Sequence, residues 1–130
     1  MGDEAAILAR AFLEAIVVKD RDALVSVLDP EIDFRGLTPS RDWRATTQEE
    51  VLEIVLGNWF EPEDHVLEVL EVLTEPIADR QHLAYRLHVE NGGEEFLVEQ
   101  QAFFDAPAGR ITRMSVVCSG FRPWEAAAAG

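Results

Sequence analysis

The second half of the chain alternates apolar and polar residues over four unusually long stretches, and this pattern restricts the fold more than any other feature of the sequence. The stretches cover residues 64–75, 80–90, 94–105 and 110–121. Short segments rich in Pro, Gly, Asn and Asp separate them, and Asn91-Gly92-Gly93 supplies the positive φ values that a tight hairpin needs. The pattern predicts four consecutive antiparallel strands joined by short turns.

The length of these predicted strands determines the shape of the sheet. Each has about eleven or twelve residues, roughly twice the usual number, and would span about 40 Å. A sheet with strands this long must twist and curl, and its concave face then needs a cover. We therefore expect an α+β half-barrel with helices packed into the concave face, and a pocket at the open end if the helices leave one.

The first half of the chain supplies the helices that such a sheet requires. Apolar residues recur at helical spacing over residues 3–18, where Asp3 is the expected N-cap. Asp20 precedes a second predicted helix over residues 21–28, which Pro30 prevents from continuing.

A short strand and a third helix are predicted before the four long strands. Residues 31–36 alternate with period two and predict the strand. Residues 37–45 contain turn-forming residues and predict a loop. Thr47 and Glu50 have the spacing of a capping box, which predicts a helix over residues 47–59.

The length and charge of the chain limit its organisation and its partners. The 130 residues suffice for one domain, which we expect to span residues 1–123, with a C-terminal tail over residues 124–130. With 25 acidic and 11 basic residues the net charge is −14, so neither nucleic acid nor a membrane surface is an expected partner. Residues 45–79 hold ten of the acids and no Lys or Arg, which indicates a solvated face whose field favours neutral or cationic ligands.

Cysteine and histidine usage bears on the compartment and on metal binding. The single cysteine, Cys118, cannot form an intramolecular disulfide, which favours a reducing compartment. The acidic N-terminus does not resemble a signal peptide, and no apolar run is long enough to cross a bilayer. We therefore expect a cytoplasmic protein. The histidines lack the spacing of metal ligands, so no metal site and no cofactor are predicted.

The order of helix, helix, short strand, helix and four-strand meander resembles the nuclear transport factor 2-like superfamily, specifically its SnoaL-like branch. The segments that carry the resemblance are residues 29–36 (DPEIDFRG), 83–87 (LAYRL), 100–104 (QQAFF), 109–111 (GRI) and 118–123 (CSGFRP). It covers about residues 3–123. It implies a cone in which three N-terminal helices pack in the concave face of a strongly curved antiparallel sheet.

The resemblance also implies a set of functions. The superfamily includes steroid isomerases, polyketide cyclases, epoxide hydrolases, dehydratases and non-catalytic binding or dimerisation modules. We expect the cone pocket to bind a small neutral apolar or polyketide- or steroid-like molecule, with isomerase, cyclase or hydrolase activity left open. The alternative is a non-catalytic dimerisation or protein-partner module with a filled cone. In either case the resemblance implies a homodimer through the convex face of the sheet.

The catalytic groups of the enzymatic branches are each incomplete when they are carried over residue by residue. The position of the isomerases' carboxylate base falls on Arg35 or Gly36, and an arginine cannot act as a base. Their second group falls on Gln100 or Gln101, whose amide can donate a hydrogen bond to a developing oxyanion. For the Asp-Arg-Asp set of the epoxide hydrolases, the chain offers Arg86 without an evident pair of inward carboxylates.

The alternation of residues 82–90 leaves two interpretations of the site. Either Leu83, Tyr85 and Leu87 pack against the helices, or Arg86 and His88 project into a polar cavity, where His88 would be a general base. The candidate catalytic residues are His88, Arg86, Asp33 and Gln100. The candidate ligand-binding residues are Phe34, Arg35, Trp43, Trp59, Tyr85, Gln101, Met114 and Cys118. For Trp43, in the predicted loop, a lid at the pocket mouth and a loop anchor are both consistent with the sequence.

Overall fold

The computed structural model describes residues 4–125 as one sheet with helices on a single face. The expected N-cap Asp3 and most of the predicted tail, residues 126–130, lie outside the described residues. The helices are α1 (Glu4–Val18), α2 (Arg21–Val27), α3 (Gln48–Ile54) and the five-residue π-helix η1 (Val55–Trp59). The strands are β1 (Leu28–Thr38), β2 (Arg41–Ala45), β3 (His65–Ile77), β4 (Arg80–Asn91), β5 (Glu94–Asp105), β6 (Ile111–Cys118) and β7 (Arg122–Pro123).

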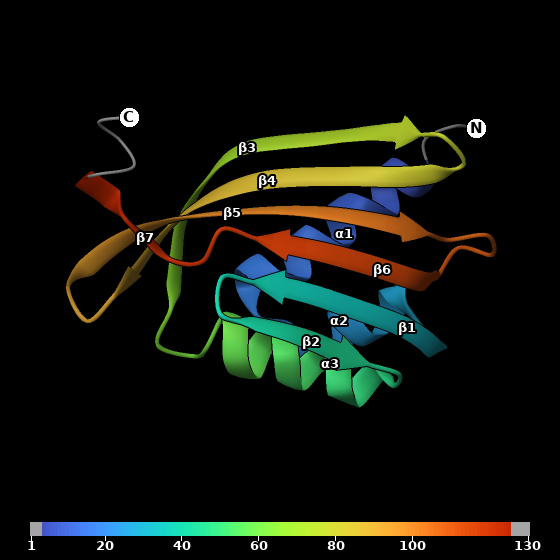
Figure 1. Ribbon diagram of the computed structural model, residues 1–130, viewed down its shortest axis with the longest axis horizontal. Coiled ribbons are helices and arrows are strands. Elements are labelled where there is room, and N and C mark those ends of the chain that lie inside the picture. The colour runs from blue at the N-terminus through green and yellow to red at the C-terminus, as the bar shows by residue number, and fades with distance from the viewer. Residues whose placement is uncertain (1–3, 126–130) are drawn as a thin grey trace.

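The sheet has the strand order β2-β1-β6-β5-β4-β3, with β7 paired to β5. Strands β3 to β6 form the predicted antiparallel meander, and β1 joins it in parallel to β6. Figure 1 shows the strands as one curved layer with α1, α2 and α3 on one side of it. We call the side toward the helices the inner face and the opposite side the outer face. The predicted α+β class with a strongly curved sheet is confirmed.

Side-chain caps begin the second and third helices where the sequence predicts them. The carboxylate of Asp20 accepts a hydrogen bond of 3.0 Å from the backbone N–H of Ala23. The Thr47 hydroxyl accepts one of 3.1 Å from the backbone N–H of Glu50. The Glu50 carboxylate accepts from the backbone N–H of Thr46 at 2.9 Å, one residue before the donor of a standard capping box.

The segment predicted as a loop contains a strand. Residues 41–45 form β2, which pairs antiparallel with β1 and places Trp43 opposite Gly36. This strand is rich in charged residues, so its sequence shows little of the apolar alternation by which strands are predicted. The predicted last strand, residues 110–121, also differs, because β6 ends at Cys118 and a separate short strand, β7, follows it.

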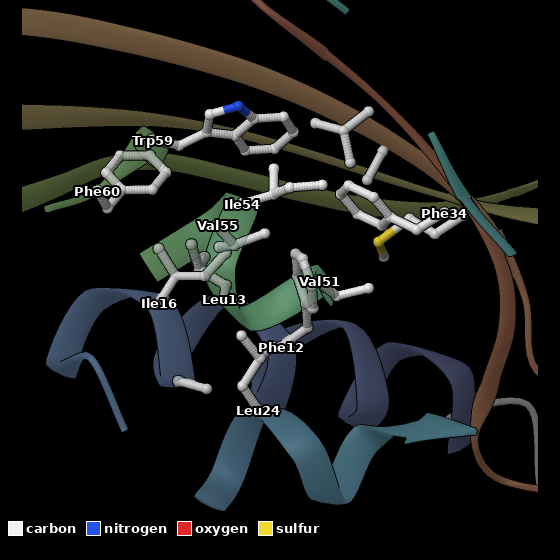
Figure 2. Close-up of a cluster of buried hydrophobic side chains, with 14 of the residues drawn as sticks. Phe12, Leu13, Ile16, Leu24, Phe34, Val51, Ile54, Val55, Trp59 and Phe60 are labelled. Carbon is white, nitrogen blue, oxygen red and sulfur yellow. The ribbon is translucent and has the colours of Figure 1, made fainter. Parts of the chain in front are cut away.

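The hydrophobic core lies between the inner face and the helices. Figure 2 shows Phe12 and Ile16 of α1 and Val51 of α3 gathered below Phe34 and Trp59. The first turn of α1, Ala5 to Leu8, is only partly buried, whereas the core positions of the strands are closed to solvent. Within residues 4–125, no helix is long and apolar enough to cross a membrane.

Candidate functional site

A buried polar pair lies on the inner face, across strands β4 and β5. Tyr85 and Gln100 are direct cross-strand partners, and each is only 2% exposed. The Tyr85 hydroxyl donates a hydrogen bond to Oε1 of Gln100. Burial, together with the nearby Cys118, raises the pKa of the Tyr85 hydroxyl, so the phenol stays protonated and remains a donor. The pair is therefore neutral.

Nε2 of Gln100 and Nε1 of Trp59 are buried and have no hydrogen-bond partner among the described residues. Reversing the Gln100 amide would only exchange which of its atoms is unpaired, because within the described chain Tyr85 alone bonds to it. A buried N–H without an acceptor costs about 1–3 kcal/mol. Two such donors within an apolar core need a specific explanation.

Trp59 is placed by an unusual piece of backbone and by aromatic contacts. It is the last residue of η1, and single turns of π-helix often occur at functional sites. Its ring lies 5.8 Å from the Phe34 ring and 6.3 Å from the Trp43 ring, the latter edge-on. Gly36 makes room for it, because a Cβ at that position would lie 2.4 Å from the indole. In Figure 2 the indole nitrogen is on the edge of the ring that faces the strands.

The other candidate ligand-binding residues, Phe34, Met114, Cys118 and Trp43, pack on or beside the inner face. Phe34 and Met114 are neighbours on β1 and β6 and belong to the core. Cys118, opposite Gln100 on β6, accepts a hydrogen bond of 3.3 Å at Sγ from the backbone N–H of Gly120. Trp43 is half-buried on β2, where Nε1 donates to the Thr38 hydroxyl at 3.0 Å. This hydrogen bond and the edge-on contact with Trp59 hold the Trp43 ring in place.

The four candidate catalytic residues are not brought together. Gln100 is the only one of them on the inner face. Arg86 lies on the outer face with Nε 3.2 Å from a Glu99 oxygen, at an angle too poor for a hydrogen bond. His88, also on the outer face, contacts Glu95 through Nε2 and stacks on Trp124 at 3.7 Å. The interpretation in which Arg86 and His88 project into the cone is corrected, because they alternate with the buried Tyr85, Leu87 and Val89.

Asp33, Arg35 and Gln101 also face outward, for the same reason of strand alternation. Asp33 and Arg35 flank the buried Phe34, and Gln101 follows the buried Gln100. Gln101 is held on the outer face by a hydrogen bond of 2.9 Å between its Oε1 and the His82 ring. The expectation that these three side chains meet a ligand in the cone is therefore corrected.

The comparisons with solved structures identify the fold. No protein-family model matches the sequence, and no curated protein matches it. A Bacillus subtilis protein provisionally named an isomerase superposes with a TM-score of 0.76 at 13% identity, over 90% of this chain and 87% of that one. A Xanthomonas campestris protein provisionally named a polyketide cyclase gives 0.69 at 17% identity, over 88% and 90%. An LEH-like epoxide hydrolase of M. tuberculosis gives 0.67 at 15% identity, over 89% and 83%. The chain has the nuclear transport factor 2-like fold.

Within this nuclear transport factor 2-like fold, the larger hollows on the surface of residues 4–125 include none that Tyr85, Trp59 or Gln100 lines. The inner face is packed closely around the polar pair, and both Trp59 (7% exposed) and Cys118 (8%) retain a small contact with solvent. A ligand on the inner face must therefore displace side chains at the rim of the cone.

A second buried polar group was not found by sequence reasoning. Asp64, just before β3, is 5% exposed and accepts hydrogen bonds from the Glu61 backbone N–H at 2.9 Å and from Asn91 at 2.7 Å. Lys19, after α1, has a buried Nζ without a hydrogen-bond partner in the described chain. Burial lowers the pKa of Lys19, while Asp64 and Glu63 oppose this shift. No motif or period links these positions, so only the fold brings them together.

The remaining chemistry of the site is limited. Among residues 4–125, no group of three His, Cys, Asp or Glu side chains is arranged to hold a metal ion. The buried polar or charged residues in that range are Asp64 and Gln100. As far as these described residues show, the inner face offers hydrogen-bond donors in an apolar setting, without a carboxylate or imidazole beside Gln100 to move a proton.

Proposed function

We propose that the inner face binds a small, uncharged and largely apolar molecule that carries a hydrogen-bond acceptor, such as a ketone oxygen. The observation that carries this proposal is the pair of buried, unpaired N–H groups of Gln100 and Trp59. An acceptor on the ligand would satisfy donors that the protein leaves without partners, and apolar side chains such as Phe34 and Met114 would contact the rest of the molecule.

The charges of the site support a neutral ligand. The hydrogen bond from Tyr85 to Oε1 of Gln100 polarises the amide and strengthens its N–H groups as donors, without adding a charge. Apart from the Lys19 ammonium, which lies near Asp64 and Glu63, no cationic group of the described residues is buried on the inner face to compensate an anionic ligand, and the overall charge of −14 repels anions further.

The same residues limit the chemistry that we propose. The N–H of Gln100 or that of Trp59 can stabilise negative charge that develops on a carbonyl oxygen, as a donor of an oxyanion hole does. Removal of a proton from carbon also needs a base, and the candidate bases Asp33 and His88 lie on the outer face. We therefore propose binding as the function. The isomerase, cyclase and hydrolase names belong to the similar structures.

The test uses two rigid probes that differ by one acceptor, 9-fluorenone and its parent hydrocarbon fluorene. Calorimetric titration should give binding of both, with roughly tenfold tighter binding of the ketone because it alone accepts a hydrogen bond. Trp59→Phe keeps an aromatic ring and removes the N–H. Gln100→Leu is combined with Tyr85→Phe, so that no buried hydroxyl loses its partner. Each of these variants should reduce the preference for the ketone.

The matched control is Gln101→Leu, the same substitution one residue further along β5 and on the outer face. It should leave both affinities unchanged. Failure of the natural protein to bind either probe, or an equal loss of preference in Gln101→Leu, would contradict the proposal.

A second candidate function is supported by the close packing of the inner face. A filled cone is the expected property of a non-catalytic dimerisation or partner module, and exposed apolar side chains such as Leu37 and Val117 lie side by side on the outer face. The homodimer remains a prediction. If neither probe binds and light scattering coupled to size exclusion gives the mass of two chains, this second function is favoured.

A further inference from the structure

The outer face contains a polar hollow that is separate from the inner-face site. It lies where β1 and β6 run side by side and has a volume of about 270 Å³. Its lining consists of Asp33, Arg35, Arg80, Arg113, Met114 and Ser115. A neighbouring hollow shares Arg35 and Ser115 with it and adds Arg44, together with Asp42. Four of the eleven basic residues of the chain therefore gather here, in a protein whose net charge is −14.

Of these four arginines, only Arg80 forms an ion pair within the described part of the chain. Arg35 and Arg44 are direct cross-strand partners on β1 and β2, an arrangement of like charges that destabilises a sheet. In the described part of the chain, the ion pairs involve neither of them, nor Arg113. Like charges that lie together without partners destabilise the fold. An anion that binds between them would relieve this repulsion and would be attracted by several guanidinium groups at once.

Arg80 is held in position by a partner outside the hollow. Its Nε lies 3.0 Å from Oδ1 of Asp105, and Nη2 lies 3.5 Å from Oδ2. A guanidinium has five N–H groups, so this pairing leaves others free to meet a ligand. Because Asp105 already holds the Arg80 side chain in place, less conformational entropy is lost when an anion binds.

Asp33 restricts the kind of anion that the hollow accepts. It is the register partner of Arg113, on the adjacent strand, and its carboxylate lines the same hollow. A carboxylate repels a fully ionised anion but accepts a hydrogen bond from an anion that retains an O–H or N–H group. The hollow thus combines guanidinium donors for an oxyanion with one acceptor for a donor on that same ligand.

We propose that this outer-face hollow binds a small oxyanion that carries its own hydrogen-bond donor, of which monohydrogen phosphate is the simplest example. Arg35 and Arg113 bind the ionised oxygens, Arg80 supports them, and Asp33 accepts the hydrogen bond from the protonated oxygen. Arginine is suited to this role because its planar fork matches the oxygens of phosphate and carboxylate groups.

Inorganic phosphate and sulfate provide the test, because they have the same shape but only phosphate retains a proton near neutral pH. Calorimetric titration at constant ionic strength should show binding of phosphate and roughly tenfold weaker binding of sulfate. Arg35→Gln and Arg113→Gln should each weaken phosphate binding by roughly tenfold. Asp33→Asn should remove the preference for phosphate over sulfate while phosphate still binds.

The control variant is Arg21→Gln, which removes an exposed arginine on α2, away from the sheet, and should not change binding. Absence of phosphate binding by the natural protein would overturn the proposal, as would equal weakening by Arg21→Gln. The mass of each variant in solution is measured alongside. If Arg35→Gln and Arg113→Gln alter the number of associated chains, these arginines contact a second copy and the proposal is wrong.

Discussion

The close approach of Gly36 to Trp59 shows how one residue sets the geometry of the inner face. A Cβ at position 36 would lie 2.4 Å from Cζ2 and 2.5 Å from Cη2 of the indole, well inside contact distance. The Trp59 ring, in turn, is packed against Phe34 and Trp43 and has little freedom to move. The absence of a side chain at Gly36 therefore positions one of the two unpaired donors.

We predict that Gly36→Ala destabilises the protein by about 1–3 kcal/mol, because the added methyl group overpacks the core. Urea denaturation followed by circular dichroism measures the change in the free energy of unfolding. The combination with Trp59→Phe should recover part of the loss, because the smaller ring leaves room for the methyl group. Gly57→Ala is the control, since its Cβ would meet only Glu53 at 3.8 Å. A loss in Gly57→Ala as large as in Gly36→Ala would contradict the argument.

The site residues divide sharply into those that sequence periodicity can place and those that it cannot. Alternation along β4 places Tyr85 and His88 on opposite faces, and this separation is present in the structure. Periodicity does not reveal which face the helices cover, and so it left Arg86 and His88 as candidates for the cone. The position of Lys19 near Asp64 depends on tertiary structure alone.

At the scale of elements, side-chain hydrogen bonds at the start of α3 stabilise the helix. Thr47 accepts from the Glu50 N–H, and Glu50 accepts from the Thr46 N–H, so both ends of the capping arrangement are made. We predict that Thr47→Ala lowers the free energy of unfolding by about 1 kcal/mol, because the cap loses its acceptor. Thermal and urea denaturation measure this. Thr46→Ala, which leaves both backbone bonds intact, is the control and should cost less.

Glu50 makes the stability of α3 depend on pH. The backbone N–H of Thr46 is the largest cause that lowers the pKa of the Glu50 carboxyl. A carboxylate with a lowered pKa in the folded state stabilises the fold above its unfolded pKa of about 4.3, and this contribution disappears as the pH falls through the lower folded value. We predict that Glu50→Gln reduces the loss of stability between neutral pH and about pH 3. An unchanged pH profile in urea denaturation would contradict this role.

The elements themselves were predicted in proportion to the strength of their local signals. The four-strand meander and the caps at Asp20 and Thr47 have strong signals, and the structure contains them. Strand β2 is not predicted, because its charged residues show no apolar alternation. Its pairing with β1, a tertiary contact, stabilises it as a strand. The change from α-helix to π-helix at Val55 also has no sequence signature, although it places Trp59.

At the scale of the whole molecule, acidic residues lie along one exposed edge of the sheet. Strand β3 is the last in the strand order, is 13 residues long, and exposes apolar side chains such as Leu67 (53%) and Leu73 (46%). A long apolar edge strand is a template for pairing with another chain. Irregular pairing near Glu68 and Glu71, both exposed, and the charges of these residues interrupt that template.

We predict that Glu68→Gln combined with Glu71→Gln increases aggregation several-fold at equal protein concentration, because an exposed edge then lacks its charges. Static light scattering over time measures the rate. The matched control is Glu53→Gln with Glu31→Gln, which raises the net charge of −14 by the same two units at exposed positions on α3 and β1, away from β3. Equal aggregation of both double variants would assign the effect to net charge, whereas aggregation of the β3 variant alone assigns it to the edge strand. Glu68 and Glu71 lie within the acidic segment 45–79. Aggregation of the β3 variant alone would therefore show that these acids of the segment maintain solubility. Charge patterning by itself does not distinguish this role from that of a solvated face.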